Sequence, residues 1–267
     1  MARISVIMGI YNCASTLQEA LDSLYNQTFQ DFEIILCDDG SNDNTYELAL
    51  DNKSKHDNII LLRNETNLGL NITLNKCLAA AKGEYIARMD GDDISLPTRF
   101  EKQVIFLDNH PEYAIVSTPM IHFDEEGEIF RGRVHEGEAS KDVFNYGPPF
   151  CHAPSMVRKS AFDAVNGYNE NSKFLRVEDY NLWMRMYAEG FKGYNLSEHL
   201  YMMRDDRNAT NRRTFNSRIN AIYAHWIAYK ELDLSLFLFI RYVLSILCIL
   251  IMPSFLYERL RKLKYKR

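Results

Sequence analysis

Apolar and polar positions along the first hundred residues follow a pattern that predicts strands separated by helices. Short apolar runs predict buried strands at residues 4–10, 32–37, 59–62 and 85–89. Apolar residues recur at helical spacing from Leu17 to Leu24, and a further helix is predicted over residues 67–81. Because strands and helices alternate, we expect an α/β fold with a mostly parallel central sheet flanked by helices.

The ends of these helices carry residues that are typical of caps. Thr16 is followed three residues later by Glu19, a spacing that predicts a capping box at the start of the first helix. Gly83 stands just beyond the helix over 67–81 and predicts its C-terminal cap. The following region, residues 111–149, has a strand-like but irregular pattern.

Polar residues cluster where the predicted parallel strands end. Tyr11 follows the first strand, Asp38 and Asp39 follow the second, and Asp90 and Asp92 follow the fourth. Sheets of this kind bind ligands at the carboxyl ends of their strands. If the strands are neighbours, the acidic clusters converge on one cleft, which is where we expect the chemistry.

The acidic loop after the fourth strand predicts a metal site. Asp90 and Asp92 are one residue apart, and carboxylate oxygens suit a hard divalent cation such as Mg²⁺ or Mn²⁺. The alternative is a solvated acidic turn, since Asp and Gly favour turns in any case. In the same way, Ser41 or Asp43 beside the second cluster could simply cap the next helix.

A further acidic residue, Asp179, opens a predicted amphipathic helix in the second half of the chain. An acid at this position also stabilises the helix dipole, so a structural role is open. The functional interpretation is a general base that takes a proton from an acceptor hydroxyl.

The sequence motifs of several other kinds of site are absent. No GxGxxG follows the first strand, and no GxxxxGK[ST], HExxH or GxSxG occurs, which argues against a dinucleotide site, a P-loop, a zinc protease and a serine hydrolase. The five cysteines are far apart and form no CxxC, which fits a reducing cytosol. His152 is the histidine nearest a plausible site, and we interpret it as structural.

The net charge of −5 hides an uneven distribution. Residues 258–267 contain six basic residues and one acidic residue, a net charge of +5, which leaves −10 for residues 1–257. This composition excludes a globally basic nucleic-acid binder, and no nucleic-acid partner is expected. The acids lie in the body of the chain, and the bases follow its most apolar stretch.

The C-terminal region predicts an attachment to a membrane. Residues 214–230 suit an amphipathic helix, and residues 234–257 contain one charge, Arg241. This segment could lie in the membrane interface, span the bilayer, or pack on the domain or a partner subunit. We favour the interface, because a span would separate the basic tail, residues 258–267, from a cytosolic domain.

The ordered motifs make the chain resemble the family 2 glycosyltransferases of bacterial envelope polysaccharide synthesis, which have the GT-A fold. The resemblance rests on SVIMGIYN (5–12), LDSLYNQTFQDFEIILCDDGSND (21–43), NLGLNITLNKCLAAAKGEYIARMDGDD (67–93), ISLPTRFEKQ (94–103), HAPSMVRKSAF (152–162), GYNE (167–170), VEDYNLWMRM (177–186) and YMMR (201–204). These segments cover most of residues 3–204. No comparable resemblance covers the chain beyond about residue 214.

The resemblance implies a role for each matching residue. Asp39 would hold the uracil of a UDP-sugar with Asp38 beside it, and Tyr11 would contact the nucleoside. Asp92 would hold a divalent metal, Mn²⁺ or Mg²⁺, and Asp90 would touch the ribose or the metal. Asp179 matches the catalytic base of an inverting transfer.

Two further matches, Arg99 and Gln103, would support the acidic loop. The resemblance implies a hexosyltransferase or N-acetylhexosaminyltransferase. The C-terminal segment predicts membrane attachment, and we therefore expect a glycan or a polyprenyl-linked saccharide as acceptor.

We therefore expect a catalytic domain over residues 1–213, with a nucleotide-binding half over 1–110 and an acceptor-binding half over 111–213. A helical extension over residues 214–267 would hold the enzyme at the cytoplasmic face of the plasma membrane, and a homo-oligomer is possible. Two alternatives are a sugar-nucleotidyltransferase and a non-catalytic nucleotide-binding scaffold. The first would normally show a Gly-rich loop followed by basic residues near the N-terminus, which residues 9–15 lack.

Overall fold

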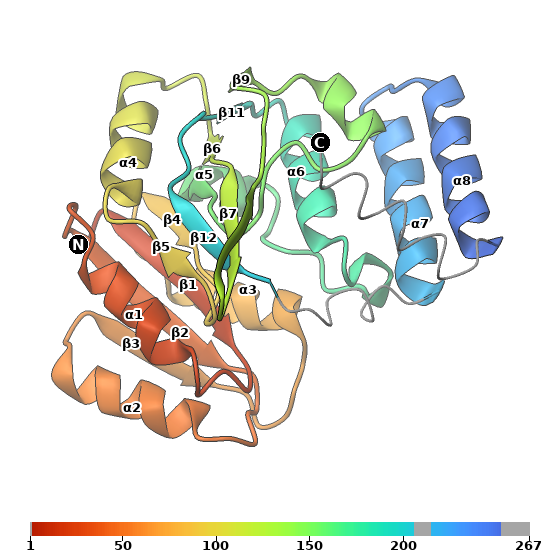
Figure 1. The fold of residues 1–267 in the computed structure, drawn as a ribbon. Helices are drawn as coiled ribbons and strands as arrows, with labels where there is room; N and C mark the ends of the chain where they lie inside the picture. The colour runs from red at the N-terminus through yellow and green to blue at the C-terminus, as the bar shows by residue number, and fades with distance from the viewer. Residues whose placement is uncertain (1, 206–214, 252–267) are drawn as a thin grey trace.

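The structure, a computed structural model, describes residues 2–205 and 215–251. The predicted basic tail, residues 258–267, and the end of the apolar segment, residues 252–257, lie outside the described residues. Within the described ranges, two sheets and the helices around them form the body of the molecule (Figure 1).

The larger sheet has eight strands in the order β3-β2-β1-β4-β10-β6-β11-β9. Their bounds are β1 Ile4–Ile10, β2 Phe32–Asp38, β3 Ile59–Arg63, β4 Tyr85–Arg88, β6 Ile115–Ser117, β9 Gly137–Glu138, β10 Met156–Arg158 and β11 Gly193–Asn195. The four predicted strands are confirmed as β1 to β4, and all four run parallel. They therefore bring the ends of β1, β2 and β4 to one edge of the sheet.

Helices cover both faces of this sheet (Figure 1). The helices of the first half are α1 Leu17–Tyr25, α2 Thr45–Lys55, α3 Leu70–Ala80 and α4 Arg99–Asn109, and α5 Lys159–Ala164 and α6 Glu178–Ala188 follow. Alternate residues of β1 point to opposite faces. Val6 and Met8 pack with α1, α2 and α4, whereas Ile7 packs with α3, α5 and α6. The expected α/β fold, with a mostly parallel central sheet flanked by helices, is confirmed.

A smaller sheet carries the strand that reaches the acidic loop. Its strands are β5 Ile94–Ser95, β12 Tyr201–Arg204, β7 Met120–Asp124 and β8 Gly127–Arg131, in that order. β12 pairs antiparallel with β5 and parallel with β7. This pairing places Tyr201 and Arg204 beside the residues that follow β4.

Thr16 precedes α1 as its N-cap residue, as predicted, but the capping-box hydrogen bond is absent, and the cap predicted at Gly83 is wrong. The Thr16 hydroxyl makes no cap hydrogen bond and donates instead to the Gly91 carbonyl, 3.0 Å away, in the acidic loop. Gly83 does not end a helix, because α3 already ends at Ala80. A Cβ at Gly83 would lie 2.6 Å from the Ser5 amide nitrogen, so glycine is required there by close approach of β1.

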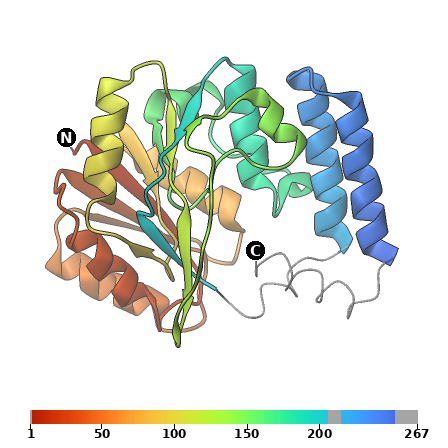
Figure 2. The same cartoon turned by 45° about the horizontal axis from the view of Figure 1, so that its top comes forward.

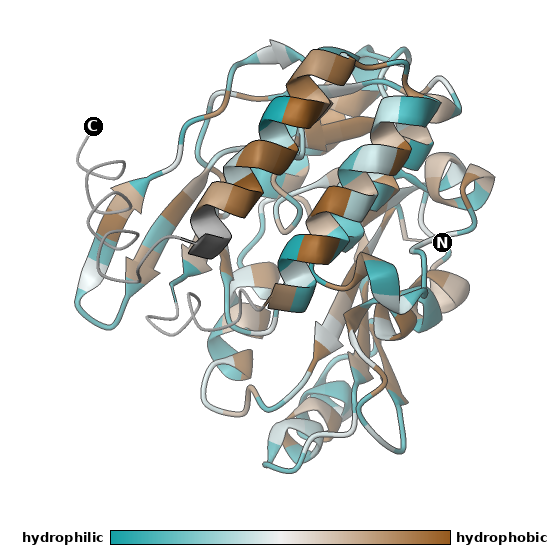
Figure 3. Cartoon of the chain, turned by 90° about the vertical axis from the view of Figure 1, so that its right-hand side faces the viewer, coloured by the Kyte–Doolittle hydropathy of each residue, from teal (hydrophilic) through white to brown (hydrophobic). Residues whose placement is uncertain are grey.

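Beyond α6, two helices, α7 Phe215–Glu231 and α8 Leu236–Ile251, lie side by side at one end of the molecule (Figures 1 and 2). α7 confirms the helix predicted over residues 214–230, and it buries Ala224, His225 and Ala228 against the core. α8 is largely hydrophobic and faces outward (Figure 3). In residues 2–205 and 215–251, no helix is both long and apolar enough to cross a membrane.

Candidate active site

Asp39 lies at the end of β2 and holds the loop that leads into α3. Its carboxylate accepts hydrogen bonds from the Leu68 amide at 2.8 Å, the Gly69 amide at 2.9 Å and the Asn64 side chain at 2.7 Å. Gly40 permits this turn, because its φ is +71° and a Cβ there would lie 2.7 Å from the Thr66 backbone. Three donors leave one lone-pair direction of the carboxylate for a ligand.

Asp38 has a different environment from its neighbour. Its side chain is fully buried, and one carboxylate oxygen lies 3.3 Å from Nε of Arg63. The Arg63 guanidinium in turn lies over the Tyr46 ring, 4.0 Å from its centre. The carboxylate thus ties β2 to β3, and a ligand contact by Asp38 stays a prediction.

Tyr11 opens the loop after β1 and is half exposed. The next residue, Asn12, has a φ of +48°, and its backbone amide donates to the Ser41 hydroxyl at 3.0 Å. The Asn12 side chain accepts a hydrogen bond from the Asn42 amide at 2.9 Å. The loops after β1 and β2 are therefore joined, which fixes Tyr11 near Asp39.

The acidic loop after β4 gathers three carboxylates. Asp90, Asp92 and Asp93 each offer an oxygen, and these oxygens lie within 4.8 Å of one another. Asp93 is buried and accepts from the Tyr201 hydroxyl at 2.9 Å and the Arg204 amide at 2.8 Å, both on β12. The sequence indicated Asp90 and Asp92, and the structure adds Asp93 as the residue that anchors the loop.

The carboxylates of this loop repel one another. The pKa of Asp92 is raised, first by desolvation and second by the negative charge of Asp90. The pKa of Asp93 is also raised, by burial and then by both neighbouring acids. A divalent cation would remove this repulsion, and three carboxylate oxygens are donors that suit Mg²⁺ and Mn²⁺. The donor set therefore fits the predicted metal.

Arg99 and Gln103 hold the backbone that leads into the loop. The buried Arg99 guanidinium donates to the Arg88 carbonyl at 2.8 Å and to the carbonyls of Ala153 and Ser155 at 3.3 Å. Gln103 donates to the Pro154 carbonyl at 2.7 Å. These bonds join the end of β4 to the segment before β10, as a supporting role requires.

Asp179 is the second residue of α6 and is half buried. Its carboxylate accepts a hydrogen bond from the Tyr180 amide at 2.7 Å. Burial and then the charge of Glu178 raise its pKa to about 6, although the Tyr180 amide and the Arg88 guanidinium act in the opposite direction. A carboxylate with this pKa is ionised at neutral pH and remains basic enough to accept a proton.

Arg88 is the residue that sequence reasoning missed. Its buried guanidinium, on the last residue of β4, forms an ion pair with Asp90. The same charge opposes the rise in the pKa of Asp179 and adds to the lowering of the pKa of His152. Arg88 therefore acts on the acidic loop through Asp90 and also on the predicted base. An arginine inside an otherwise apolar strand, two residues before an acidic loop, was the signal available in the sequence.

His152 is held in the protein interior, in agreement with the structural interpretation. Its Nε2 lies 2.8 Å from the Tyr168 hydroxyl, and its ring meets the Trp183 ring edge to face. Burial, with a smaller effect of Arg88, lowers its pKa well below the usual range. It is therefore neutral near pH 7.

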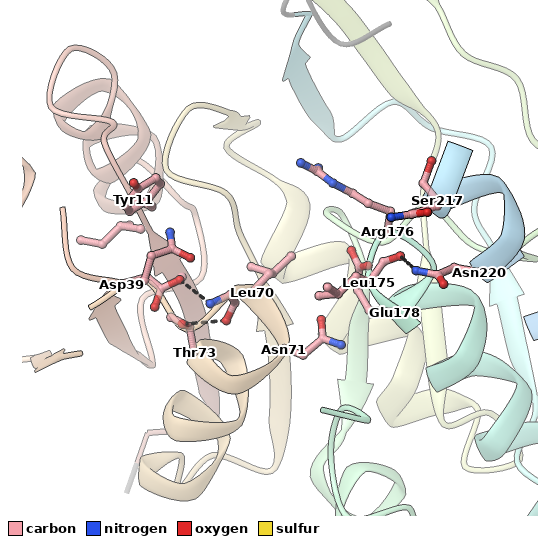
Figure 4. Close-up of a pocket in the computed structure, with 15 residues that line it drawn as sticks. Tyr11, Asp39, Leu70, Asn71, Thr73, Leu175, Arg176, Glu178, Ser217 and Asn220 are labelled. Carbon is pink, nitrogen blue, oxygen red and sulfur yellow. Dashed lines mark hydrogen bonds between the residues drawn. The ribbon is translucent and has the colours of Figure 1, made fainter. Parts of the chain in front are cut away.

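A pocket of about 680 Å³ joins the strand ends to α6 and α7 (Figure 4). Tyr11, Asp39 and the first turn of α3 line one side. Leu175, Arg176 and Glu178 line the other, with the first turns of α7. Asn220 of α7 donates to the Leu175 carbonyl at 3.2 Å. The contribution of α7 to this pocket was not predicted from the sequence.

Comparison with known proteins identifies this arrangement. Residues 5–165 match the sequence profile described as Glycosyl transferase family 2. The chain belongs to glycosyltransferase family 2. The matched region contains β1 to β4, the Asp39 turn and the whole acidic loop, whereas Asp179 and the C-terminal helices lie beyond it.

Full-length relatives extend this family 2 similarity over the rest of the chain. EpsE of Bacillus subtilis is 42% identical over 97% of this chain and 93% of its own length. The amylovoran biosynthesis glycosyltransferase AmsE of Erwinia amylovora is 30% identical over 97% of this chain and 99% of its own length. A third relative, 29% identical over 73% of this chain and 74% of its own length, is WfaP of Escherichia coli, a UDP-Glc:α-D-GlcNAc-diphosphoundecaprenol β-1,3-glucosyltransferase.

Two solved structures share the fold, which is that of GT-A glycosyltransferases. TarS of S. aureus in complex with UDP-GlcNAc superposes with a TM-score of 0.71 at 22% identity, over 86% of this chain and 66% of that chain. The mannosyltransferase PcManGT of Pyrobaculum calidifontis, in complex with GDP-Man and Mn²⁺, gives a TM-score of 0.61 at 15% identity, over 87% of this chain and 74% of that chain. At these identities the likeness concerns the fold.

Proposed function

We propose that this family 2 glycosyltransferase transfers a sugar, with inversion, from a UDP-sugar to a hydroxyl of a glycan or lipid-linked saccharide in surface polysaccharide synthesis. The observation that carries the proposal is the pocket lined by Asp39 on one side and on the other by Glu178, the residue before Asp179. The names of WfaP, a UDP-glucose enzyme with a diphosphoundecaprenol acceptor, and of AmsE support the same class of donor and product.

The chemistry follows from the two ends of the pocket. Asp39 has a free lone pair at the end of β2 for the N–H of a uracil. At the other end, the acceptor hydroxyl attacks the anomeric carbon while the bond from that carbon to the diphosphate oxygen breaks. Asp179 takes the hydroxyl proton. Asp90 and Asp92 would hold a divalent cation, whose positive charge stabilises the diphosphate.

A screen of UDP-sugars for UDP release, with Mg²⁺ or Mn²⁺ and Asp179→Asn as the control, tests the proposal. We expect release with at least one donor and an acceptor extract, and a loss of release in the variant. The outcome that contradicts the proposal is a wild-type protein that no nucleotide sugar protects from thermal unfolding.

We also propose that α8 attaches the enzyme to the inner face of the plasma membrane. Exposed apolar side chains recur along it at helical spacing, at Phe237, Ile240, Leu244 and Leu247. The basic segment over residues 258–267 follows in the sequence and would be attracted to anionic lipid. A helix of this kind lies in the interface with its apolar face in the lipid.

Vesicle sedimentation with phosphatidylglycerol tests this attachment. The double variant Phe237→Glu, Leu244→Glu should stay in the supernatant, and the matched control Ile105→Glu, Ile129→Glu changes exposed apolar residues elsewhere and should still bind. If the wild type is dimeric without lipid and the α8 variant is monomeric, the helix joins two copies and the membrane proposal is wrong.

A further inference from the structure

Arg176 has a backbone conformation that few side chains adopt. Its φ is +68°, in the left-handed region, and it lies between the short helix η2 Ser172–Phe174 and α6. The neighbouring contacts hold it there. The Val177 amide donates to the Phe174 carbonyl at 3.2 Å, and Asn220 of α7 donates to the Leu175 carbonyl at 3.2 Å. Such strain is found at functional sites, where the surrounding structure maintains it.

The result of this conformation is a charged side chain directed over the pocket. Arg176 lines the pocket, is exposed, and extends away from α6 towards the side that carries Tyr11 (Figure 4). Within residues 2–205 and 215–251, no carboxylate forms an ion pair with it. This distinguishes Arg176 from Arg88, which is paired with Asp90.

Most of the other polar residues that line the pocket are uncharged. Four of them carry neutral amides, namely Asn67, Asn71, Asn216 and Asn220. Asp39, on the far side, is already bonded to Asn64 and two backbone amides. Glu178 is the remaining acid in the lining. The pocket thus has an acceptor for a nucleobase at one side and an available guanidinium at the other.

We propose that Arg176 binds a phosphate oxygen of a diphosphate in this pocket and is a specificity-determining residue for diphosphate-bearing ligands. The inference rests on the proposed function. A guanidinium presents a planar fork of donors that matches phosphate oxygens, and hydrogen bonds between charged groups are the strong ones. The diphosphate can belong to the nucleotide donor or to a polyprenyl-linked acceptor.

Binding of paired probes to the full-length protein tests the proposal and separates the two sources. Uridine and UDP differ by the diphosphate of the donor, and geranyl diphosphate represents the acceptor. The variant is Arg176→Asn, because asparagine tolerates a positive φ and removes the charge. Arg133→Asn, at an exposed arginine outside the pocket lining, is the matched control, and Arg176→Lys keeps the charge without the fork.

For a donor contact, we expect Arg176→Asn to weaken UDP binding about 10- to 100-fold while uridine binding stays unchanged. For an acceptor contact, binding of geranyl diphosphate weakens by that factor and UDP binding stays unchanged. Arg176→Lys should fall between the variant and the wild type. The proposal is overturned if Arg176→Asn binds all three probes within twofold of the control.

The same data separate this proposal from the proposed function. A wild-type protein that binds neither uridine nor UDP refutes the donor assignment, and one that binds none of the three probes refutes the role of Arg176 as well. A wild-type protein that binds uridine and UDP, with an Arg176→Asn variant that binds UDP and geranyl diphosphate as the wild type does, refutes the role of Arg176 alone. Thermal unfolding of the variant near the wild-type temperature shows that the backbone at residue 176 is kept.

Discussion

Replacing Asp179 by asparagine should make the protein more stable and less active. The pKa of this carboxyl is raised from 3.8 to about 6, chiefly by burial. At pH 8 the side chain is ionised in the folded and the unfolded state, and the folded state bears the cost of a desolvated charge. Two pKa units correspond to about 3 kcal/mol. Because the side chain is only half buried, we reduce the expected gain to about 1–2 kcal/mol.

The dependence on pH identifies the cause of the gain. Between pH 4 and pH 6 the folded protein holds a proton on Asp179 that the unfolded chain has lost. The stability of the wild type therefore falls as pH rises through this window, relative to the variant. The difference between the two proteins should be largest at pH 8, about half as large at pH 5, and nearly absent at pH 4.

Urea unfolding at these three pH values measures the difference, and thermal unfolding at pH 8 should show a gain of roughly 2–6 °C. Sugar transfer by the variant should fall by about 10²–10⁴-fold, the usual effect of losing a general base. Asp163→Asn, at an exposed acid on α5, is the control. Full activity in Asp179→Asn, or a stability difference that does not vary with pH, would refute the reasoning.

Three further variants test other parts of the site. Asp92→Asn should abolish the rise in unfolding temperature caused by Mn²⁺ plus UDP, whereas Asp57→Asn at an exposed acid should not. Asp39→Asn places an amide against two backbone N–H donors, so we expect a loss of about 1–3 kcal/mol in urea unfolding and weaker uridine binding in calorimetry. Burial lowers the pKa of His225 to about 4, so the wild type should lose about 2 kcal/mol relative to His225→Phe between pH 7 and pH 5. A difference between the two proteins that stays the same from pH 7 to pH 5 would show that His225 does not titrate in this way.

The strands and the acidic clusters could be predicted because their signals are local. β1 and β2 consist mostly of apolar residues, and the polar residues at and beyond their ends mark the strand ends directly in the sequence. The parallel order then brings Tyr11 and Asp39 to one edge of the sheet. Asp179 was found in the same way, as the start of an amphipathic helix.

The errors concern residues whose partners are distant in sequence. Thr16 matches a capping box, but its hydroxyl donates to Gly91, 75 residues away. Gly83 matches a helix cap, but the approach of Ser5 explains it. Local patterns predict where a helix or strand lies. They do not predict a distant hydrogen-bond partner that competes for the polar groups at its ends. The contribution of α7 to the pocket was missed for the same reason, since Asn220 bonds to a carbonyl 45 residues earlier.

The C-terminal helices α7 and α8 are connected by direct contacts to the residues around the predicted base. The Tyr180 ring stacks on His225 of α7 at 4.4 Å between centres, and His225 stacks on Tyr242 of α8 at 3.6 Å. The Tyr180 amide is also the hydrogen-bond donor to Asp179. The proposed lipid-contacting helix, α8, is thus linked through two ring contacts to Tyr180, the neighbour of the predicted base. Since Asn220 also bonds to the loop of Arg176, movement of α7 would displace the side of the pocket that lies opposite Asp39.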